Sequence, residues 1–214
     1  MITFDHVRQA LALRDFDSAT AQQRMAPAPR GRQQRDAPPK RAAVLILLYQ
    51  SGDDRLRVVL TLRNPDLRGH SGQVSFPGGQ MDPRDPSPTH TALRETREEI
   101  GISADALFIL GELPRFYIPA SHYDVSPIVV GHYGIPAFEL NPDEVAAVFN
   151  FTLEDLLQPR FKRVEQRLIR GYDVRVPYYD VQGHKVWGAT AMMLSELEAR
   201  LRQILPDDIT LVLD

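Results

Sequence analysis

Three glutamates in one short stretch have the spacing of a carboxylate cluster. Glu95, Glu98 and Glu99 stand at positions i, i+3 and i+4, so a helix brings them to one face with Cβ atoms about 5–6 Å apart. Carboxylates this close repel one another, and a hard divalent cation such as Mg²⁺ or Mn²⁺ offsets the repulsion because it prefers oxygen ligands. Such an ion can neutralise charge on a phosphoryl oxygen and activate water. The other interpretation is a solvated acidic face that pairs with Arg94 and Arg97.

A glycine turn and a helix provide the setting for this cluster. Residues 76–79 read Phe-Pro-Gly-Gly, and glycine lets the backbone approach a metal ion or a phosphate closely. A free carbonyl at Gly79 would add another oxygen ligand. Residues 89–100 contain neither Gly nor Pro, and Gly101 follows them, which predicts a helix that ends there. The turn and the helix together favour the metal-binding interpretation.

The elements around this motif alternate between strands and helices. The apolar runs at 42–49 and 57–62 predict two strands of a β-hairpin. Mixed strands with helices before, between and after them predict a layered α/β domain. The further elements expected are strands at 107–110, 125–130 and 145–149, a hairpin within 168–179 that turns near Gly171, and a helix over 189–205 with Met192, Leu194, Leu197, Leu201 and Leu205 in the core.

The first forty residues differ in composition from the rest of the chain. Residues 2–16 have the apolar spacing of a short amphipathic helix. Residues 19–40 are rich in Pro, Gln, Ala and Arg, which predicts a loop or an extended arm. Its basic residues are either a solvated tether or part of an arm that helps to hold an anionic ligand. We therefore divide the chain into a helix and arm over 1–40 and one domain over 41–214. The basic residues of the arm are Arg30, Arg32, Arg35, Lys40 and Arg41.

Composition excludes several classes of function. The 214 residues include no cysteine, which excludes disulfides, thiolate metal sites and cysteine nucleophiles. A net charge of −3 gives no general attraction to nucleic acid. The longest apolar stretch, residues 42–49, is too short to span a membrane, and the first residues lack the pattern of a signal peptide. We expect a cytoplasmic protein with neither a nucleic acid nor a membrane as its partner.

The turn and the acidic helix resemble the Nudix box. The similarity lies in the glycine at 79, the loop after it, and the run Arg-Glu-x-x-Glu-Glu-x-Gly at 94–101. Thr96 stands where an aliphatic residue is usual, and the loop is one residue longer than the general pattern. Asp85 or Asp82 must therefore replace the first acid of the box. The resemblance implies a Nudix fold, an α/β/α sandwich with a mixed β-sheet, and metal-dependent hydrolysis of a diphosphate.

A second resemblance concerns the substrate. Residues 60–79 are similar to the motif of the coenzyme A diphosphatase subfamily, with Val59 and Asn64 as modest departures. Segments 141–145 and 187–191 also resemble that subfamily. The resemblance implies cleavage of coenzyme A or its derivatives into 3′,5′-ADP and 4′-phosphopantetheine. Arg63 and Arg68 would contact phosphate oxygens through planar, charge-assisted bonds, although ordinary surface ion pairs are the other interpretation.

These resemblances imply roles for individual residues. Glu144 either serves as a base or extra ligand across the cleft, or favours a helix start. Two alternatives stay open: a Nudix hydrolase of ADP-ribose, a dinucleoside polyphosphate or a nucleoside triphosphate, and a nucleotide- or RNA-binding module without turnover. A homodimer is also left open. The implied site is Glu95, Glu98, Glu99 and the Gly79 carbonyl around Mg²⁺ or Mn²⁺, Glu98 or Glu144 as base, Arg94 orienting the glutamates, and Arg63, Arg68 and Gly78 at the substrate.

Overall fold

A mixed eight-stranded β-sheet is the centre of the computed structural model, which describes residues 1–29, 37–66, 72–169 and 171–205. Strand β1 (Lys40–Gln50) pairs antiparallel with β2 (Leu56–Arg63) and parallel with β7 (Tyr123–Tyr133). The predicted β-hairpin is therefore confirmed. The other members are β3 (Val74–Ser75), β4 (Gly78–Gln80), β5 (Phe108–Glu112), β6 (Phe116–Ile118) and β8 (Val145–Thr152).

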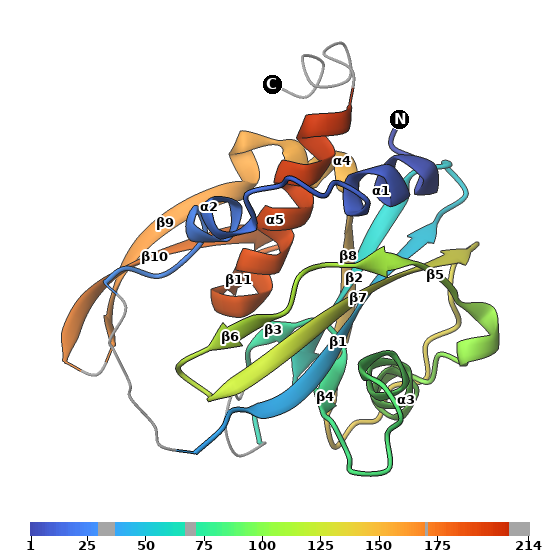
Figure 1. The fold of residues 1–214 in the computed structure, drawn as a ribbon, viewed down its shortest axis with the longest axis horizontal. Helices are drawn as coiled ribbons and strands as arrows, with labels where there is room; N and C mark the ends of the chain where they lie inside the picture. The colour runs from blue at the N-terminus through green and yellow to red at the C-terminus, as the bar shows by residue number, and fades with distance from the viewer. Residues whose placement is uncertain (30–36, 67–71, 170, 206–214) are drawn as a thin grey trace.

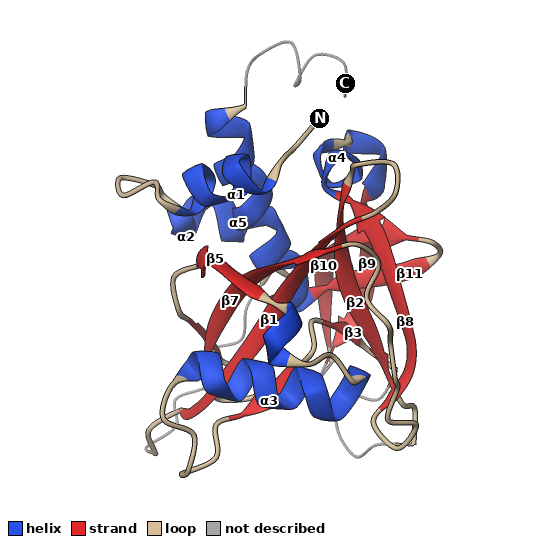
Figure 2. Cartoon of the chain, turned by 90° about the vertical axis from the view of Figure 1, so that its right-hand side faces the viewer, coloured by secondary structure: helices blue, strands red, loops and turns tan. Residues whose placement is uncertain are grey.

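Helices cover both faces of this sheet (Figures 1 and 2). Along β1, Leu45 and Leu47 belong to the apolar cluster beneath helix α3 (Pro88–Ile100), whereas Ile46 and Leu48 belong to the cluster on the opposite face. Successive strand residues point to opposite faces, so a strand buried on both sides must be apolar throughout. This arrangement confirms the predicted α/β/α sandwich with a mixed sheet.

The opposite face carries helix α5 (Gly188–Ile204) and a second, three-stranded sheet. That sheet contains β9 (Lys162–Ile169), β10 (Tyr172–Val181) and β11 (His184–Trp187), and the predicted hairpin near Gly171 is its β9–β10 pair. No helix in the described ranges is long and apolar enough to cross a membrane. The five core contacts predicted for α5 are all buried: Met192, Leu194, Leu197, Leu201 and Leu205. Short helical elements α4 (Leu153–Leu157), η1 (Ala104–Ala106) and η2 (Pro159–Phe161) complete the fold.

The N-terminal elements correct two predictions. Helix α1 spans only Phe4–Leu11, not residues 2–16, and the segment expected as loop from residue 19 contains helix α2 (Ser18–Gln23). The guanidinium of Arg200 in α5 donates to the carbonyls of Ala10 and Leu13, which end helix α1. Asp17 caps α2 by accepting from the Thr20 amide. The Arg200 contacts come from far along the chain, so local composition does not encode them, whereas the Asp17 cap is a local signal.

Helix α1 shares the main core. Ile2, Phe4 and Val7 belong to the same apolar cluster as residues of β1, β2 and α5. Their burial joins the start of the chain to the large sheet by hydrophobic contact. The division at residue 40 stays a prediction.

Candidate active site

Helix α3 has defined ends that fix the register of its acidic face. The Ser87 hydroxyl accepts from the His90 amide at 3.1 Å, Pro88 opens the helix, and Gly101 closes it with φ +76°. These caps are those that such residue types favour, and they confirm the predicted helix end. Thr96, at a position where aliphatic residues are usual, is fully buried and donates its hydroxyl to the Ala92 carbonyl at 2.7 Å. Thr96 therefore introduces no unpaired polar group at a position where the Nudix box usually has an aliphatic side chain.

Glu99 is a buried carboxylate at the end of this face. Its side chain is only 3% exposed, and it accepts from the Gly78 amide at 3.0 Å. Burial raises the pKa of Glu99 to about 7. The charges of Glu144 and Glu95 raise the pKa further, while the Gly78 amide and Arg63, whose Nη1 lies 3.5 Å away, lower it. A further cation bound beside Glu99 would therefore stabilise the charged form of this carboxylate.

Glu95 lies directly against the glycine turn. A Cβ atom at Gly79 would come within 2.4 Å of the Glu95 Oε2, so only glycine leaves room for this carboxylate. Burial raises the pKa of Glu95, the Arg94 guanidinium at 2.8 Å lowers it, and the charges of Glu98 and Glu144 raise it again. The turn and the helix thus place the half-buried Glu95 and the buried Glu99 beside the same short backbone segment.

The two glycines of the turn present different groups. Gly79 lies opposite Ala43 in the β1–β4 ladder. A hydrogen bond closes the ladder on each side of this pair: the Leu45 amide donates to the Pro77 carbonyl, and the Met81 amide donates to the Arg41 carbonyl. Alternation in an antiparallel ladder then turns the Gly79 carbonyl towards β1, which does not fit the expected free carbonyl at this residue. The Gly78 amide instead points to Glu99. Gly78 is therefore the residue whose backbone faces the acidic helix.

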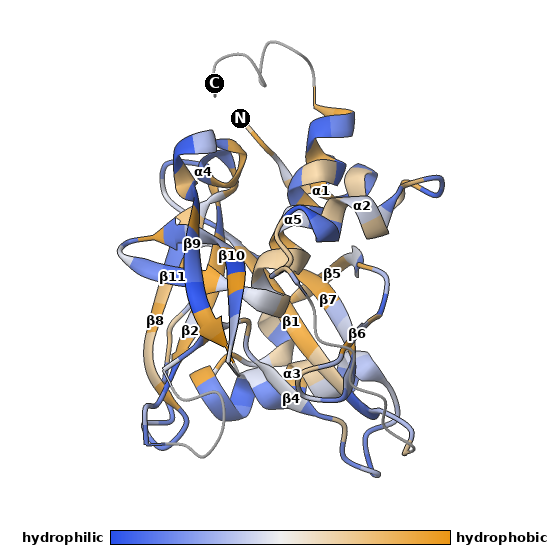
Figure 3. Ribbon diagram, turned by 90° about the vertical axis from the view of Figure 1, so that its left-hand side faces the viewer, coloured by the Kyte–Doolittle hydropathy of each residue, from blue (hydrophilic) through white to orange (hydrophobic). Residues whose placement is uncertain are grey.

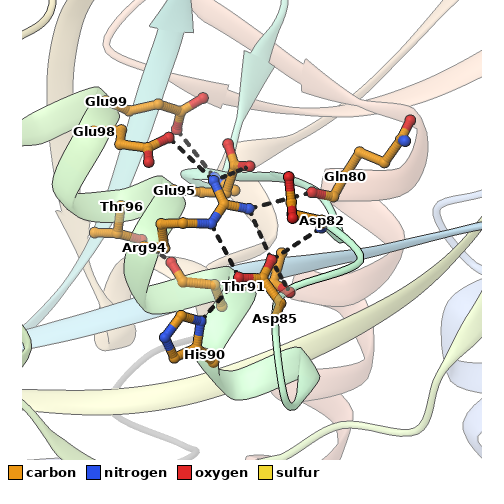
Figure 4. A network of polar contacts seen from close by, with 12 residues as sticks. Gln80, Asp82, Asp85, His90, Thr91, Arg94, Glu95, Thr96, Glu98 and Glu99 are labelled. Atoms are coloured by element: carbon orange, nitrogen blue, oxygen red, sulfur yellow. Dashed lines mark hydrogen bonds and ion pairs between the residues drawn. The ribbon is translucent and has the colours of Figure 1, made fainter.

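Arg94 ties the acidic helix to the preceding loop (Figure 4). Its Nη1 lies 2.8 Å from Glu95 and 3.1 Å from Glu98, and its Nε and Nη2 donate to Asp85. The Arg94 guanidinium is the main reason that the pKa of buried Asp85 is well below its usual range. Asp82 pairs with Arg84 instead. Asp85 is thus the acid that occupies the position expected for either aspartate.

Glu144 approaches the cluster from another part of the chain. The Asn141 amide donates to the Glu99 carbonyl at 3.0 Å, and the Asn64 amide donates to the Glu144 carbonyl at 2.9 Å. These bonds fix the loop beside α3, and the Glu144 charge raises the pKa values of Glu95 and Glu99. Glu144 immediately precedes strand β8 and not a helix, so the helix-start interpretation is wrong.

Arg63 ends β2 within reach of the cluster. Its Nε is buried and has no hydrogen-bond partner in the described ranges, although buried polar groups are nearly always paired. An anionic ligand would satisfy this donor. Arg68, the second arginine predicted to contact substrate, lies outside the described residues.

The donor set fits a hard divalent cation. In the part of the chain that the structure describes, no three acidic or histidine side chains form a closed metal site. Glu95 and Glu98 instead pair with Arg94, and Glu99 pairs with Gly78 and Arg63. The acidic side chains beside the turn offer carboxylate oxygens, which are the ligands that Mg²⁺ and Mn²⁺ prefer.

Arg41, one of the basic residues grouped with the arm, lies at a different pocket. Arg41 lines a surface pocket of about 650 Å³ together with Arg14, Arg115 and Arg200. None of the four glutamates named above lines it. Since residues 30–36 lie outside the described ranges, the anion-binding interpretation of the arm stays a prediction.

The sequence patterns did not identify three supporting residues. Thr91 and His90 bond the carboxylate of Asp85, and Asn141 contacts both Glu99 and Glu144. Thr91 and His90 follow the loop closely, so a search for partners of an expected buried aspartate could have found them. Asn141 belongs to a loop whose path the spacing does not define.

Comparisons with known proteins agree with this geometry. The model of the NUDIX domain family matches residues 39–172. The chain is 37% identical over 162 residues to Nudix hydrolase 15, mitochondrial, of Arabidopsis thaliana, over 73% of this chain and 56% of that protein. It is 37% identical over 176 residues to the uncharacterised Nudix hydrolase NudL of Photorhabdus laumondii, over 77% and 90% of the two chains. The chain thus spans about half the length of the Arabidopsis relatives.

A solved structure supports the fold. The Nudix hydrolase RenU of M. smegmatis is similar with a TM-score of 0.56 and 16% identity, over 81% of this chain and 92% of that one. Identity this low shows the fold alone. The family match and the identity to the NudL relative show that this chain belongs to the Nudix hydrolase family.

Proposed function

We propose that this protein is a metal-dependent diphosphohydrolase that cleaves coenzyme A or its derivatives. The observation that carries the reaction class is the cluster of Glu95 and Glu99, which lie against the Gly78–Gly79 turn beside the unpaired Nε of Arg63. Carboxylates with perturbed pKa values next to an unsatisfied guanidinium donor are typical of a binding site for a charged ligand. Nudix hydrolases generally use divalent metal ions.

Glu95, Glu98 and Glu99 would hold Mg²⁺ or Mn²⁺. We assign the backbone ligand to the Gly78 carbonyl instead of that of Gly79, because alternation in the β1–β4 ladder turns the Gly79 carbonyl towards β1. When bound, the ion supplies positive charge to the diphosphate oxygens and activates water. Arg94, which contacts both Glu95 and Glu98, would leave Glu98 when the ion neutralises that carboxylate.

The remaining polar groups have separate roles in this proposal. Arg63 binds a diphosphate oxygen through its free Nε, and Arg94 orients Glu95. Glu144 is the better candidate for the base, since it accepts from Asn141 and has no cation partner in the described ranges. Glu98 is paired with Arg94 and 53% exposed. Glu144→Gln should therefore lower kcat at saturating Mg²⁺ by at least about 100-fold, and near-normal kcat in folded Glu144→Gln would contradict Glu144 as the base.

The substrate assignment depends on residues 60–79, which resemble the coenzyme A diphosphatase motif. Strand β2 ends at Arg63 and β3 begins at Val74, so the two ends of this segment lie on adjacent strands at the site. The Arg63 amide donates to the Gln73 carbonyl at 3.0 Å. Arg68, inside the segment, is proposed to contact a substrate phosphate. A cytoplasmic location stays a prediction.

A substrate panel tests this assignment. We expect kcat/KM for coenzyme A to exceed that for dephospho-coenzyme A, ADP-ribose and diadenosine tetraphosphate, with Mg²⁺ or Mn²⁺ present. A higher value for ADP-ribose or the dinucleotide would overturn the coenzyme A assignment and leave the hydrolase. A compound that binds and is recovered unchanged with either ion, while the whole panel stays intact, would contradict the enzyme and favour a binding module.

A further inference from the structure

Strand β9 forms an outer edge of the three-stranded sheet, whose order is β11-β10-β9. Figure 3 shows β9 and β10 on the side that faces the viewer. Val164 and Leu168 are 50% and 74% exposed, and Gln166 between them is also exposed. An edge strand with exposed apolar side chains can pair with another strand. No other strand in the described ranges pairs with this edge.

The backbone groups of β9 that face outward can be identified. Ala28 and Arg175 exchange two hydrogen bonds, of 3.0 and 2.8 Å, on the side of β10 away from β9. Arg175 lies opposite Gln166, so these two residues form a non-hydrogen-bonded pair. Alternation in the ladder then directs the N–H and C=O groups of Val164, Gln166 and Leu168 outward. The free edge therefore offers three consecutive outward positions for a new strand.

The β9 sequence is complementary to itself in one register. Outward residues must pair with outward residues, so a two-fold axis must pass through one residue of β9. An axis at Gln166 places Glu165 opposite the partner's Arg167, and Val164 opposite the partner's Leu168. Charge and apolar character are then matched over residues 164–168 of each strand, and Arg163 lies opposite the partner's Ile169 at the ends.

Neighbouring registers lack this match. An axis at Glu165 places Glu165 opposite the partner's Glu165, and an axis at Arg167 places Arg167 opposite the partner's Arg167. Both registers are unfavourable, because like charges directly opposite are destabilising. An axis at Val164 pairs a shorter length of β9 and leaves Leu168 without an apolar partner. Charged side chains on an edge strand usually oppose pairing, but in the Gln166 register they favour a second copy.

We propose that two copies of this chain pair through the outer edge of β9, antiparallel and with the two-fold axis at Gln166. The two three-stranded sheets then join into one six-stranded sheet across the dimer. Glu165, which also contacts Lys185 and Arg167 of its own strand and sheet, would bridge to the partner's Arg167. This interface is independent of the proposed hydrolase activity.

A cysteine at the axis tests the register directly, because the natural chain has none. Hydrogen-bonded antiparallel pairs have Cα atoms about 5.5 Å apart, which suits a disulfide. Gln166→Cys should form a covalent dimer under mild oxidation, seen on a non-reducing gel. Val164→Cys is the matched control and should remain monomeric on the gel. Equal cross-linking of the two variants, or none at Gln166→Cys, would overturn the register.

Charge exchange tests the interface without a covalent bond. Light scattering should give a dimer mass for the wild type. The double variants Val164→Lys/Leu168→Lys and Val164→Glu/Leu168→Glu should each dissociate at least about tenfold more readily, and an equimolar mixture should recover the dimer. Thermal melts verify that each variant folds, since both positions are exposed. A monomeric wild type at about 50 µM, or double variants that dimerise as well as wild type, would contradict the proposal.

Discussion

Helices α3 and α5 each bury a glutamate that has an arginine beside it, but the two clusters differ in how completely their polar groups are hydrogen-bonded. On α5, Arg200 donates to Glu196 at 3.0 Å, to the Ala10 and Leu13 carbonyls and to the Ser18 hydroxyl. On α3, two glutamates have raised pKa values, and the neighbouring Arg63 has a buried Nε without a partner in the described ranges.

This difference separates a structural cluster from a ligand site. The Glu196 carboxylate also accepts from Ser18 and Gln22, so the α5 cluster ties the N-terminal helices to the core. Removing one member of such a buried pair leaves an uncompensated charge. The α3 cluster has excess negative charge and an unsatisfied donor, which an incoming cation and an anionic substrate would complement. We therefore expect changes at α5 to affect stability and changes at α3 to affect activity.

The largest expected effect is at Glu99. Glu99→Gln should lower kcat for coenzyme A by at least about 100-fold, worth roughly 3 kcal/mol or more, because it removes a proposed metal ligand. The melting temperature without metal should be unchanged or higher, since a buried charge is removed. Glu112→Gln, at an exposed position outside the site, is the control. Near-normal turnover of folded Glu99→Gln would contradict its assignment.

Arg200→Met should show the opposite behaviour. We expect the free energy of unfolding to fall by about 3 kcal/mol, because Glu196 is left buried without its cation, with kcat per folded molecule unchanged. Urea unfolding measures the loss. The double variant Glu196→Leu/Arg200→Met should recover most of it, and equal stability of the single variant and the wild type would remove the distinction between the two helices.

Asp85→Asn tests how the loop positions the acidic face. Arg94 loses its buried anion. We therefore expect kcat to fall roughly 30-fold, which corresponds to about 2 kcal/mol of activation free energy, with little change in KM. Asp85→Glu, which keeps the charge, should recover part of the rate. If KM changed instead of kcat, Asp85 would act on substrate binding and not through Arg94.

Gly79→Ala tests the close contact between the turn and Glu95. The added Cβ would displace that carboxylate, and we expect the Mg²⁺ concentration for half-maximal activity to rise about tenfold, or 1.4 kcal/mol. Gly52→Ala is the matched control, since a Cβ there meets nothing within 4 Å. An equal response of the two variants would show that the contact does not matter.

Arg63→Gln should have the smallest effect of the series. Loss of one phosphate contact should raise KM for coenzyme A about fivefold, or about 1 kcal/mol, with a smaller change in kcat. Arg63→Lys should recover less than a full contact, because a lysine ammonium lacks the planar fork. A wild-type KM in Arg63→Gln would exclude the contact.

Local spacing predicted the elements that carry the chemistry better than it predicted their partners. Helix α3 and its glutamates follow from caps and i, i+3, i+4 spacing, which are local properties. The choice of Asp85 over Asp82, and of the Gly78 carbonyl over that of Gly79, depends on the path of the loop and the β1–β4 register. The packing of α1 and α2 involves Arg200 and Glu196 of α5, which lie far along the chain, and no local pattern encodes such contacts.

Product analysis of coenzyme A tests the central proposal most directly. Wild type and Glu99→Gln would be incubated with Mg²⁺ or Mn²⁺ in oxygen-18 water, with a chelator control, and the products identified by mass spectrometry. The proposed function predicts metal-dependent 3′,5′-ADP and 4′-phosphopantetheine from wild type, one of them labelled, and almost none from folded Glu99→Gln. Intact coenzyme A with wild type under both metals, or equal cleavage by the variant, would contradict it.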